Sequence, residues 1–564
     1  MGRKALVAGW PVVLALAICA PLLAPGYVLS YDMVFVPDLD LRRDVLGLGT
    51  ALPRAVPSDA VVAVLDSVTG GMLLQKVVLL AIPAFAGWGA ALLVRDVPRS
   101  GVVAALAAAT LYVWNPFVAE RLVLGHWPLL IGYAALPWLV RSCVRVRRGV
   151  PNAWPGLLLA SAACALSASG GLVGTLVALL VVAWPRCRAR QVVALLAAVA
   201  ALNAPWWVVG LAGPGAAVSD PAGAAAFAAR DEGYGGVLPT LLTLGGVWNA
   251  DVVPESRGTL ASMAGAVAIV LLAVAGTVLW WRRQREVAAP VTVAAALMLG
   301  VALLGAVVPA AARWLVEEVP GGGLLRDGQR YLGPLALLQA AGFGLAAGAL
   351  AGRARRRWPR WSAVAVAGGL VLLPVAVLPD LAWGADGRLR PVAYPGDWSQ
   401  ARRVLDMDPH PGDLLPWPFE SYRAPAFNGG RPVVDPLPRY LPRPAVVPDE
   451  LVVGGVRLAG EDPRAAAVAA ALRSGTDATA ELLRQGVGWI VWDRQHTATD
   501  PRTVANGARP VFAGPTLTLY VVDGDPADPP EAHRTVILAA WLLAAGTVAA
   551  AAVAAVVRRS GARA

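Results

Sequence analysis

Long runs of apolar residues without an ionisable side chain constrain this chain most strongly. No charged residue occurs between Val77 and Val94, for example. A helix needs roughly 20 such residues to cross the hydrocarbon core of a bilayer, where its backbone groups can pair only with one another. We expect ten membrane spans, at about residues 5–25, 71–94, 101–118, 128–144, 191–212, 260–281, 289–312, 331–352, 362–380 and 534–557.

The charged residues agree with a membrane protein. Of the 564 residues, 57% are hydrophobic and only 15% are charged, against about 25% in soluble domains. The net charge of +11 comes largely from basic clusters at the ends of apolar runs, as in cytoplasmic loops, so we do not expect nucleic acid as a partner. These clusters are Arg145, Arg147 and Arg148; Arg186, Arg188 and Arg190; Arg282, Arg283 and Arg285; and Arg353, Arg355, Arg356, Arg357 and Arg360.

The apolar interval from Ala153 to Trp184 is too long for one span and too short for two full spans. Basic clusters flank it on both sides, which predicts two short helices that turn near residues 167–171. This gives about twelve membrane helices with both termini cytoplasmic. We read residues 1–20 as an uncleaved first span, although they resemble a signal peptide. The four cysteines, Cys19, Cys143, Cys164 and Cys187, lie in or beside apolar runs, so we expect no disulfide framework.

One outward connection, residues 381–533, is long enough to form a domain. It begins with a proline-rich stretch, continues with helical patterns in DPRAAAVAAALRSG and ATAELLRQG, and ends with the strand-like sequences VGWIVWD and LTLYVVD. The expected fold class is therefore an all-α polytopic membrane protein with a small C-terminal extracytoplasmic α/β domain. The expected domains are residues 1–380, 381–533, and 534–564 with the last span and a cytoplasmic tail.

The first outward loop, at about residues 26–70, opens with a carboxylate in apolar surroundings. Asp32 lies between Tyr31 and the sequence MVFV. Partial desolvation predicts a raised pKa for its carboxyl group and a role as general base. The alternative is an interfacial carboxylate that pairs with a nearby arginine.

Further charges follow in the same loop. Asp38 and Asp40 would project to one face of an extended segment and could share a divalent cation, the one cofactor that the sequence suggests, or a basic group. Arg42 and Arg43 are expected to hold phosphate or neighbouring carboxylates. The alternative for the aspartates is a solvated loop.

Two other outward loops carry basic residues before a span. In WNPFVAERLVLGHW, Glu120 and Arg121 are neighbours and His126 lies at the start of the following span; we expect Arg121 to clamp phosphate oxygens. In GGGLLRDGQRYLGP, Arg326 and Arg330 flank a turn at the level of the lipid headgroups and suit a phosphate or diphosphate. The alternatives are a residue of the aromatic belt for His126 and ordinary snorkelling for the two arginines.

The chain resembles the GT-C superfamily of integral-membrane glycosyltransferases, and most of all the actinobacterial cell-envelope arabinofuranosyl- and mannosyltransferases. The resemblance lies in the acidic loop starting near Asp32, the NPFVAERL loop, the hairpin around SASGG, the LRDGQRY loop and the C-terminal domain. The second acidic motif of some members is not found. Nearly the whole chain is covered.

The resemblance implies a polyprenyl-phosphate-linked sugar as donor and a hydroxyl of a cell-envelope glycan or glycolipid as acceptor. It implies that Asp32 is the catalytic base, with Asp44 as a second candidate, and that Arg326 or Arg330 stabilises the leaving phosphate. Glu120 and His126 would line the substrate site beside Arg121.

Two other classes of function are compatible with these residues. A transporter or flippase for a lipid-linked glycan would need ionisable groups near the membrane midplane, whereas nearly all ionisable residues lie at the interfaces. A scaffold for envelope assembly would use the aromatic residues of the proline-rich stretch to bind a glycan.

Overall fold

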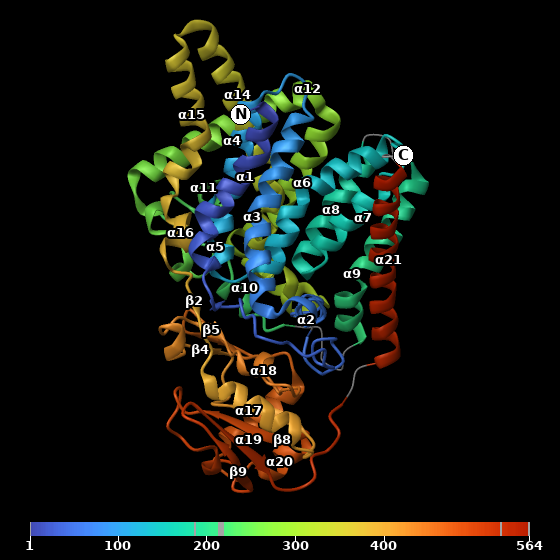
Figure 1. Cartoon of the computed structure of the whole chain (residues 1–564), viewed down its shortest axis with the longest axis vertical. Helices are drawn as coiled ribbons and strands as arrows, with labels where there is room; N and C mark the ends of the chain where they lie inside the picture. The colour runs from blue at the N-terminus through green and yellow to red at the C-terminus, as the bar shows by residue number, and fades with distance from the viewer. Residues whose placement is uncertain (1, 53, 185–187, 213–218, 531–532, 562–564) are drawn as a thin grey trace.

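The computed structural model describes residues 2–52, 54–184, 188–212, 219–530 and 533–561. A tall bundle of helices forms one part of the molecule, and a smaller region that contains the main sheet lies at one end of it (Figure 1). Within the described residues, nine helical segments are long and apolar enough to cross a membrane. They lie in α1 (Arg3–Cys19) with the turn that follows, α3 (Gly71–Arg95), α4 (Val102–Val113) with α5 (Pro116–Val123), α6 (Trp127–Arg147), α9 (Ala189–Ala212), α12 (Leu260–Val307), α14 (Gly333–Arg357), α15 (Arg360–Val377) and α21 (Arg534–Gly561).

Helix α12 contains two of the predicted spans. Its backbone leaves the helical conformation at Gln284. The Trp281 Nε1 donates to Thr292 Oγ1 at 3.0 Å, although eleven residues of straight helix would separate the two positions by about 16 Å. The helix therefore folds back on itself, and the turn carries the basic residues predicted for a cytoplasmic loop.

Two shorter helices, α7 (Trp154–Cys164) and α8 (Ala168–Ala183), occupy the interval where the sequence predicts a hairpin. The Ser167 side chain caps α8 by accepting from the backbone N–H of Gly170 at 3.1 Å. A Cβ atom on Gly171, in the first turn of α8, would lie 2.0 Å from Asn203 Oδ1, so α8 and α9 pack closely at this position. Both helices are too short to be counted as full spans, and the number of twelve crossing helices stays a prediction.

The strand-containing region is built on a four-stranded sheet with the order β3-β8-β10-β9. Strands β3 and β8 are parallel, and the other pairs are antiparallel. The continuous apolar sequence of β8 fits its burial along nearly its whole length. The strands are β3 (Asp413–Trp417), β8 (Val487–Asp493), β9 (Ala508–Ala513) and β10 (Leu517–Val522), and the helices of this region are α17 (Gly396–Met407), α18 (Leu437–Tyr440), α19 (Pro463–Arg473) and α20 (Thr479–Arg484).

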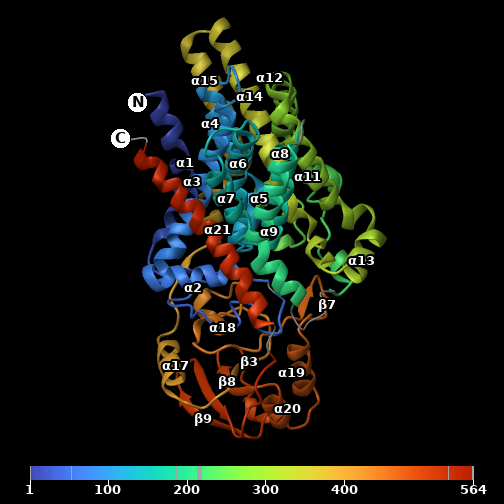
Figure 2. The same cartoon turned by 90° about the vertical axis from the view of Figure 1, so that its right-hand side faces the viewer.

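Three two-stranded ribbons and several short helices complete the fold. The ribbons are β1 (Tyr27–Val28) with β2 (Pro391–Val392), β4 (Tyr422–Arg423) with β5 (Val433–Val434), and β6 (Leu451–Val453) with β7 (Val456–Leu458). The short helices are α2 (Ser58–Thr69), α5 (Pro116–Val123), α10 (Gly223–Ala226), α11 (Val237–Leu242), α13 (Pro309–Glu318) and α16 (Ala382–Asp386). Helices α2 and α13 lie on opposite sides of the molecule (Figure 2).

The first loop, at about residues 26–70, lies against the strand-containing region. Ribbon β1–β2 joins the two, and Arg402 binds both Asp38 at 3.2 Å and Asp40 at 2.8 Å. A second link is the ion pair of Arg43 with Asp413 at 2.6 Å. These contacts fix the loop between the helices and the sheet.

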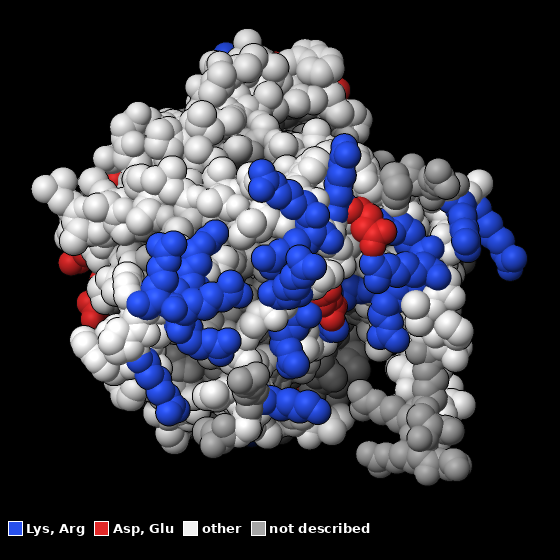
Figure 3. Space-filling view, turned by 90° about the horizontal axis from the view of Figure 1, so that it is seen from above, with Lys and Arg blue, Asp and Glu red and all other residues white. Residues whose placement is uncertain are grey.

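Lysine and arginine gather on the opposite end face of the bundle, where few acidic residues are seen (Figure 3). The turn between α14 and α15 and the turn within α12 both lie at this end (Figure 1). Two of the residues assigned to this face from the sequence, Arg186 and Cys187, lie outside the described residues. Cys19, Cys143 and Cys164 are free and buried.

Candidate active site around Asp32

Asp32 occupies the tip of a tight turn in the first loop. Ser30 and Met33 exchange backbone hydrogen bonds across the turn, and Tyr31 has a left-handed backbone with φ of 44°. The apolar residues from Met33 to Val36 are buried and anchor the segment. The Asp32 side chain, in contrast, is 43% exposed, so a soluble group can reach its carboxylate.

The turn between α5 and α6 is hydrogen-bonded to the segment that carries Asp32. The Asp32 N–H donates to the Leu124 carbonyl at 3.0 Å, and the Ser30 hydroxyl donates to the Val123 carbonyl at 2.6 Å. Gly125 has φ of 77°, and a Cβ atom there would lie 2.2 Å from Met33 N. Glycine is therefore required where the two loops touch, and His126 follows directly at the site.

Two side chains hold the carboxylate of Asp32. His126 Nε2 lies 3.2 Å from its Oδ2, and the Tyr422 hydroxyl donates to its Oδ1. Burial alone would raise the pKa of Asp32, but the contacts with His126 and Tyr422 and the charge of Arg330 lower it to about 2. The predicted raised pKa is therefore wrong, because the neighbours stabilise the ionised form.

The surroundings of His126 favour its neutral form. Burial and then the Arg330 charge lower its pKa below the ordinary 6.5. Contact with the ionised Asp32 assigns the proton to Nε2, and Nδ1 is buried without a protein hydrogen-bond partner. His126 thus serves as a hydrogen-bond donor to Asp32.

The LRDGQRY loop adds cations to the site. Arg330 lies with Nη2 3.5 Å from His126 Nε2, and its Nε donates to the buried Asp327. Arg121 lies 4.0 Å from the same Asp327 carboxylate, is fully buried and has no hydrogen-bond partner for its guanidinium group. Arg121 therefore shares the Asp327 carboxylate with Arg330 and is itself fully buried, and its predicted contact with phosphate stays a prediction.

Arg326 has a partner of its own. Glu461 binds Arg326 at 3.1 Å and Arg54 at 2.7 Å, which joins the first loop, the LRDGQRY loop and the strand-containing region. The Arg326 guanidinium also lies over the Phe227 ring, 5.0 Å from its centroid. Arg330 is accordingly the cation of this loop that faces the Asp32 carboxylate.

The structure does not bring the other predicted residues to Asp32. Arg42 binds Asp44 at 2.9 Å and donates to the Pro438 carbonyl at 2.7 Å, while Arg43 binds Asp413. Glu120 is buried, near Glu232 and Arg257. Asp38 and Asp40 share Arg402, which matches the predicted basic group, and the described residues contain no cluster of three or more metal-binding side chains.

Two residues were not predicted to lie at Asp32. The sequence suggests Tyr422 only as one of the aromatic residues of the proline-rich stretch that could stack on a glycan; it lies 390 residues from Asp32 in sequence, and no local pattern places it there. Asp327 could have been found, because an acidic residue between Arg326 and Arg330 is placed to orient one of them.

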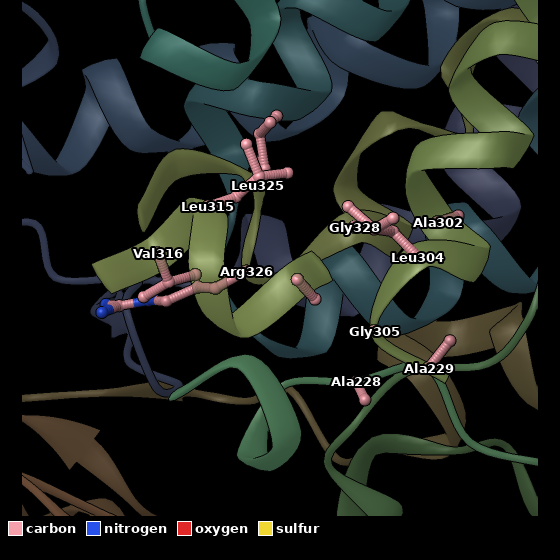
Figure 4. A pocket seen from close by; sticks show the side chains of 11 residues that line it. Ala228, Ala229, Ala302, Leu304, Gly305, Leu315, Val316, Leu325, Arg326 and Gly328 are labelled. Carbon is pink, nitrogen blue, oxygen red and sulfur yellow. The ribbon is translucent and has the colours of Figure 1, made fainter. Parts of the chain in front are cut away.

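A narrow apolar pocket adjoins the LRDGQRY loop. Its walls come from the end of α12, from α13 and from residues 228–229, with Ala229, Ala302, Gly305, Leu315 and Gly328 among its lining residues. Arg326 borders it with its alkyl chain, and the guanidinium group points away from the pocket (Figure 4). The free space between these walls is about the size of one water molecule.

Comparison with known proteins supports the architecture. No protein-family model and no curated protein matches the chain. The solved structure of arabinofuranosyltransferase AftD from Mycobacteria matches 94% of the chain with a TM-score of 0.57 and 17% identity. A mutant form of AftD matches 94% of the chain with a TM-score of 0.54 and 18% identity.

The chain spans only 40% to 42% of the length of the matched AftD chains. At this identity the similarity shows the fold alone. It shows that the chain shares the fold of the matched part of AftD, and it does not identify a family or an activity.

Proposed function

We propose that this protein is a membrane glycosyltransferase that moves a sugar from a polyprenyl-phosphate donor to a hydroxyl of a cell-envelope glycan or glycolipid. The observation that carries the proposal is an accessible Asp32 carboxylate that contacts His126, with the Arg330 guanidinium beside the same histidine. A carboxylate can accept the proton of an attacking hydroxyl, and an adjacent guanidinium can bind a phosphate. The fold shared with an arabinofuranosyltransferase supports the same activity.

In the proposed reaction, the acceptor oxygen forms a bond to the anomeric carbon of the donor sugar. The bond between that carbon and the phosphate oxygen breaks, and the configuration inverts. The acceptor proton passes to Asp32. A carboxyl with a pKa of about 2 cannot retain it, so it continues to the released phosphate, whose second pKa is about 6.

Arg330 is the proposed partner of the leaving phosphate. Its charge is held in place by Asp327, and Arg121, which shares Asp327, contributes positive potential.

We further propose that Asp32 lies at the outer face of the plasma membrane, with both termini cytoplasmic. The basic end face is the expected cytoplasmic side. Exposed apolar residues on α2 (Val64, Leu65 and Val68) and on α13 (Trp314) support contact with the outer lipid interface near the strand-containing region.

Reconstitution in liposomes tests the proposal. The purified protein would receive radiolabelled polyprenyl-phosphate arabinofuranose, or the corresponding mannose donor, with a short glycolipid acceptor. We expect transfer by the wild type and a loss of at least about a hundredfold in Asp32→Asn, the usual contribution of a general base.

Asp96→Asn is the matched control, because Asp96 has a similarly exposed carboxylate, at 48%, and binds Arg141 far from the site. Transfer that survives in Asp32→Asn would remove Asp32 as the base. Failure of the wild type with every donor would favour a transporter or a scaffold.

A further inference from the structure

Both oxygens of the Asp32 carboxylate are engaged by side chains. Oδ2 contacts His126 Nε2 at 3.2 Å, and Oδ1 accepts from the Tyr422 hydroxyl. His126 is buried, but Tyr422 and Asp32 are both exposed to solvent. The side of the carboxylate that an incoming hydroxyl can approach is thus the side that already holds a hydroxyl.

Tyr422 is held firmly in this position. It belongs to β4, whose partner β5 is bonded to the Asp32 turn through Tyr31: the Tyr31 N–H donates to Pro432, and Val434 N–H donates to Tyr31, both at 2.8 Å. Next to it, Arg423 is buried in ion pairs with Asp435 at 2.9 Å and Asp493 at 3.0 Å. The phenol can therefore leave Oδ1 by rotating its own side chain, whereas the strand stays in place.

We propose that Tyr422 determines specificity by preventing water from using Asp32 as a base, so that the donor sugar is transferred and not hydrolysed. This inference rests on the function proposed above. To reach Oδ1, a water molecule would have to displace the Tyr422 hydroxyl, and it would form only one hydrogen bond to Asp32 in exchange. An acceptor sugar brings additional contacts that can displace the phenol.

The competing reaction is defined chemically. Water oxygen would attack the anomeric carbon, the bond to the phosphate oxygen would break, and the proton would pass to Asp32, giving free sugar and lipid phosphate. Without the phenol hydroxyl, water has direct access to Oδ1. We expect the rate of hydrolysis to rise about ten- to a hundredfold, which is the factor that corresponds to the free energy of one hydrogen bond to a charged group.

The experiment compares Tyr422→Phe with wild type in liposomes that contain radiolabelled polyprenyl-phosphate arabinofuranose, with and without the glycolipid acceptor. The readout is the ratio of released sugar to transferred sugar. Tyr394→Phe is the matched control, because its hydroxyl donates to the Phe35 carbonyl at 2.9 Å in the same interface but does not touch Asp32.

The inference predicts a ratio raised at least tenfold in Tyr422→Phe alone, with a thermal unfolding temperature near that of the control. The added hydrolysis should disappear when Asp32→Asn is combined with Tyr422→Phe. An unchanged ratio in a variant that still transfers sugar would overturn the role of Tyr422 and leave the proposed function intact. A wild type that consumes no donor would overturn both.

Discussion

Replacing Arg423 by methionine should destabilise the strand-containing region strongly. The Arg423 side chain is 1% exposed and is the shared ion-pair partner of Asp435 and Asp493, whose side chains are 1% and 8% exposed. It also donates to the Pro418 carbonyl at 3.0 Å. Arg423→Met keeps most of the alkyl stem but leaves two buried carboxylates without their cation, which costs about 3–5 kcal/mol.

The dependence on pH gives the prediction its sign. Burial raises the pKa of Asp435 above 3.8, and Arg423 opposes this rise. Without Arg423 the folded-state pKa of Asp435 is higher still, so the folded variant binds more protons than the unfolded chain in the interval above 3.8. Its stability therefore falls as the pH rises through this interval, and the destabilisation is greatest near neutral pH.

The assay is thermal unfolding in detergent at about pH 4.5 and pH 7.5, followed by proteolysis of the segment that carries Tyr422. Asp435→Asn in the Arg423→Met background should recover at least about 1 kcal/mol, because it removes one unpaired charge. Arg473→Met is the control, since Arg473 is 58% exposed and its pair with Glu450 is worth less than about 1 kcal/mol. Equal destabilisation at both pH values, or a loss no larger than in the control, would refute the reasoning.

Three further predictions concern the site. Gly125→Ala should lower both the unfolding temperature and transfer, because its Cβ atom would press on Met33 N; Gly352→Ala, with nothing within 4 Å, should do neither, and equal behaviour would contradict this account. Asp327→Asn should cost about 3–5 kcal/mol in thermal unfolding and reduce transfer, because Arg121 and Arg330 lose their common counter-ion; wild-type values would rule this out. Because the pKa of Asp32 is lower in the folded protein, its carboxylate stabilises the fold at pH values above the ordinary pKa of 3.8, and this stabilisation is lost as the pH falls towards about 2. The rate of transfer should therefore show no titration of Asp32 near pH 6.

The helices and the main strands could be predicted because their signals are local. Apolar runs predict α3, α6, α9 and α21 within a few residues, and the sequences VGWIVWD and LTLYVVD become the central strands β8 and β10. The basic clusters on either side of residues 153–184 predict the hairpin of α7 and α8. In each case the residues of one short segment determine whether that segment can cross lipid, face water or form a strand.

The candidate site could be predicted only in part. Asp32, His126 and Arg330 were each noticed within their own loops, but the sequence does not show that the three loops converge. The sequence predicts phosphate binding by both Arg121 and Arg330, whereas the structure buries Arg121 completely.

The sequence by itself determined that this chain resides in a membrane. Each charged residue or unpaired backbone group costs free energy in lipid, so the long runs without charged residues are a sufficient signal. The tertiary structure alone decided the electrostatics of Asp32. Its pKa depends on His126, Tyr422 and Arg330, which come from three separate segments of the chain. Burial raises the pKa of Asp32 and pairing with these groups lowers it, and the distances between the groups determine that the lowering is the larger effect.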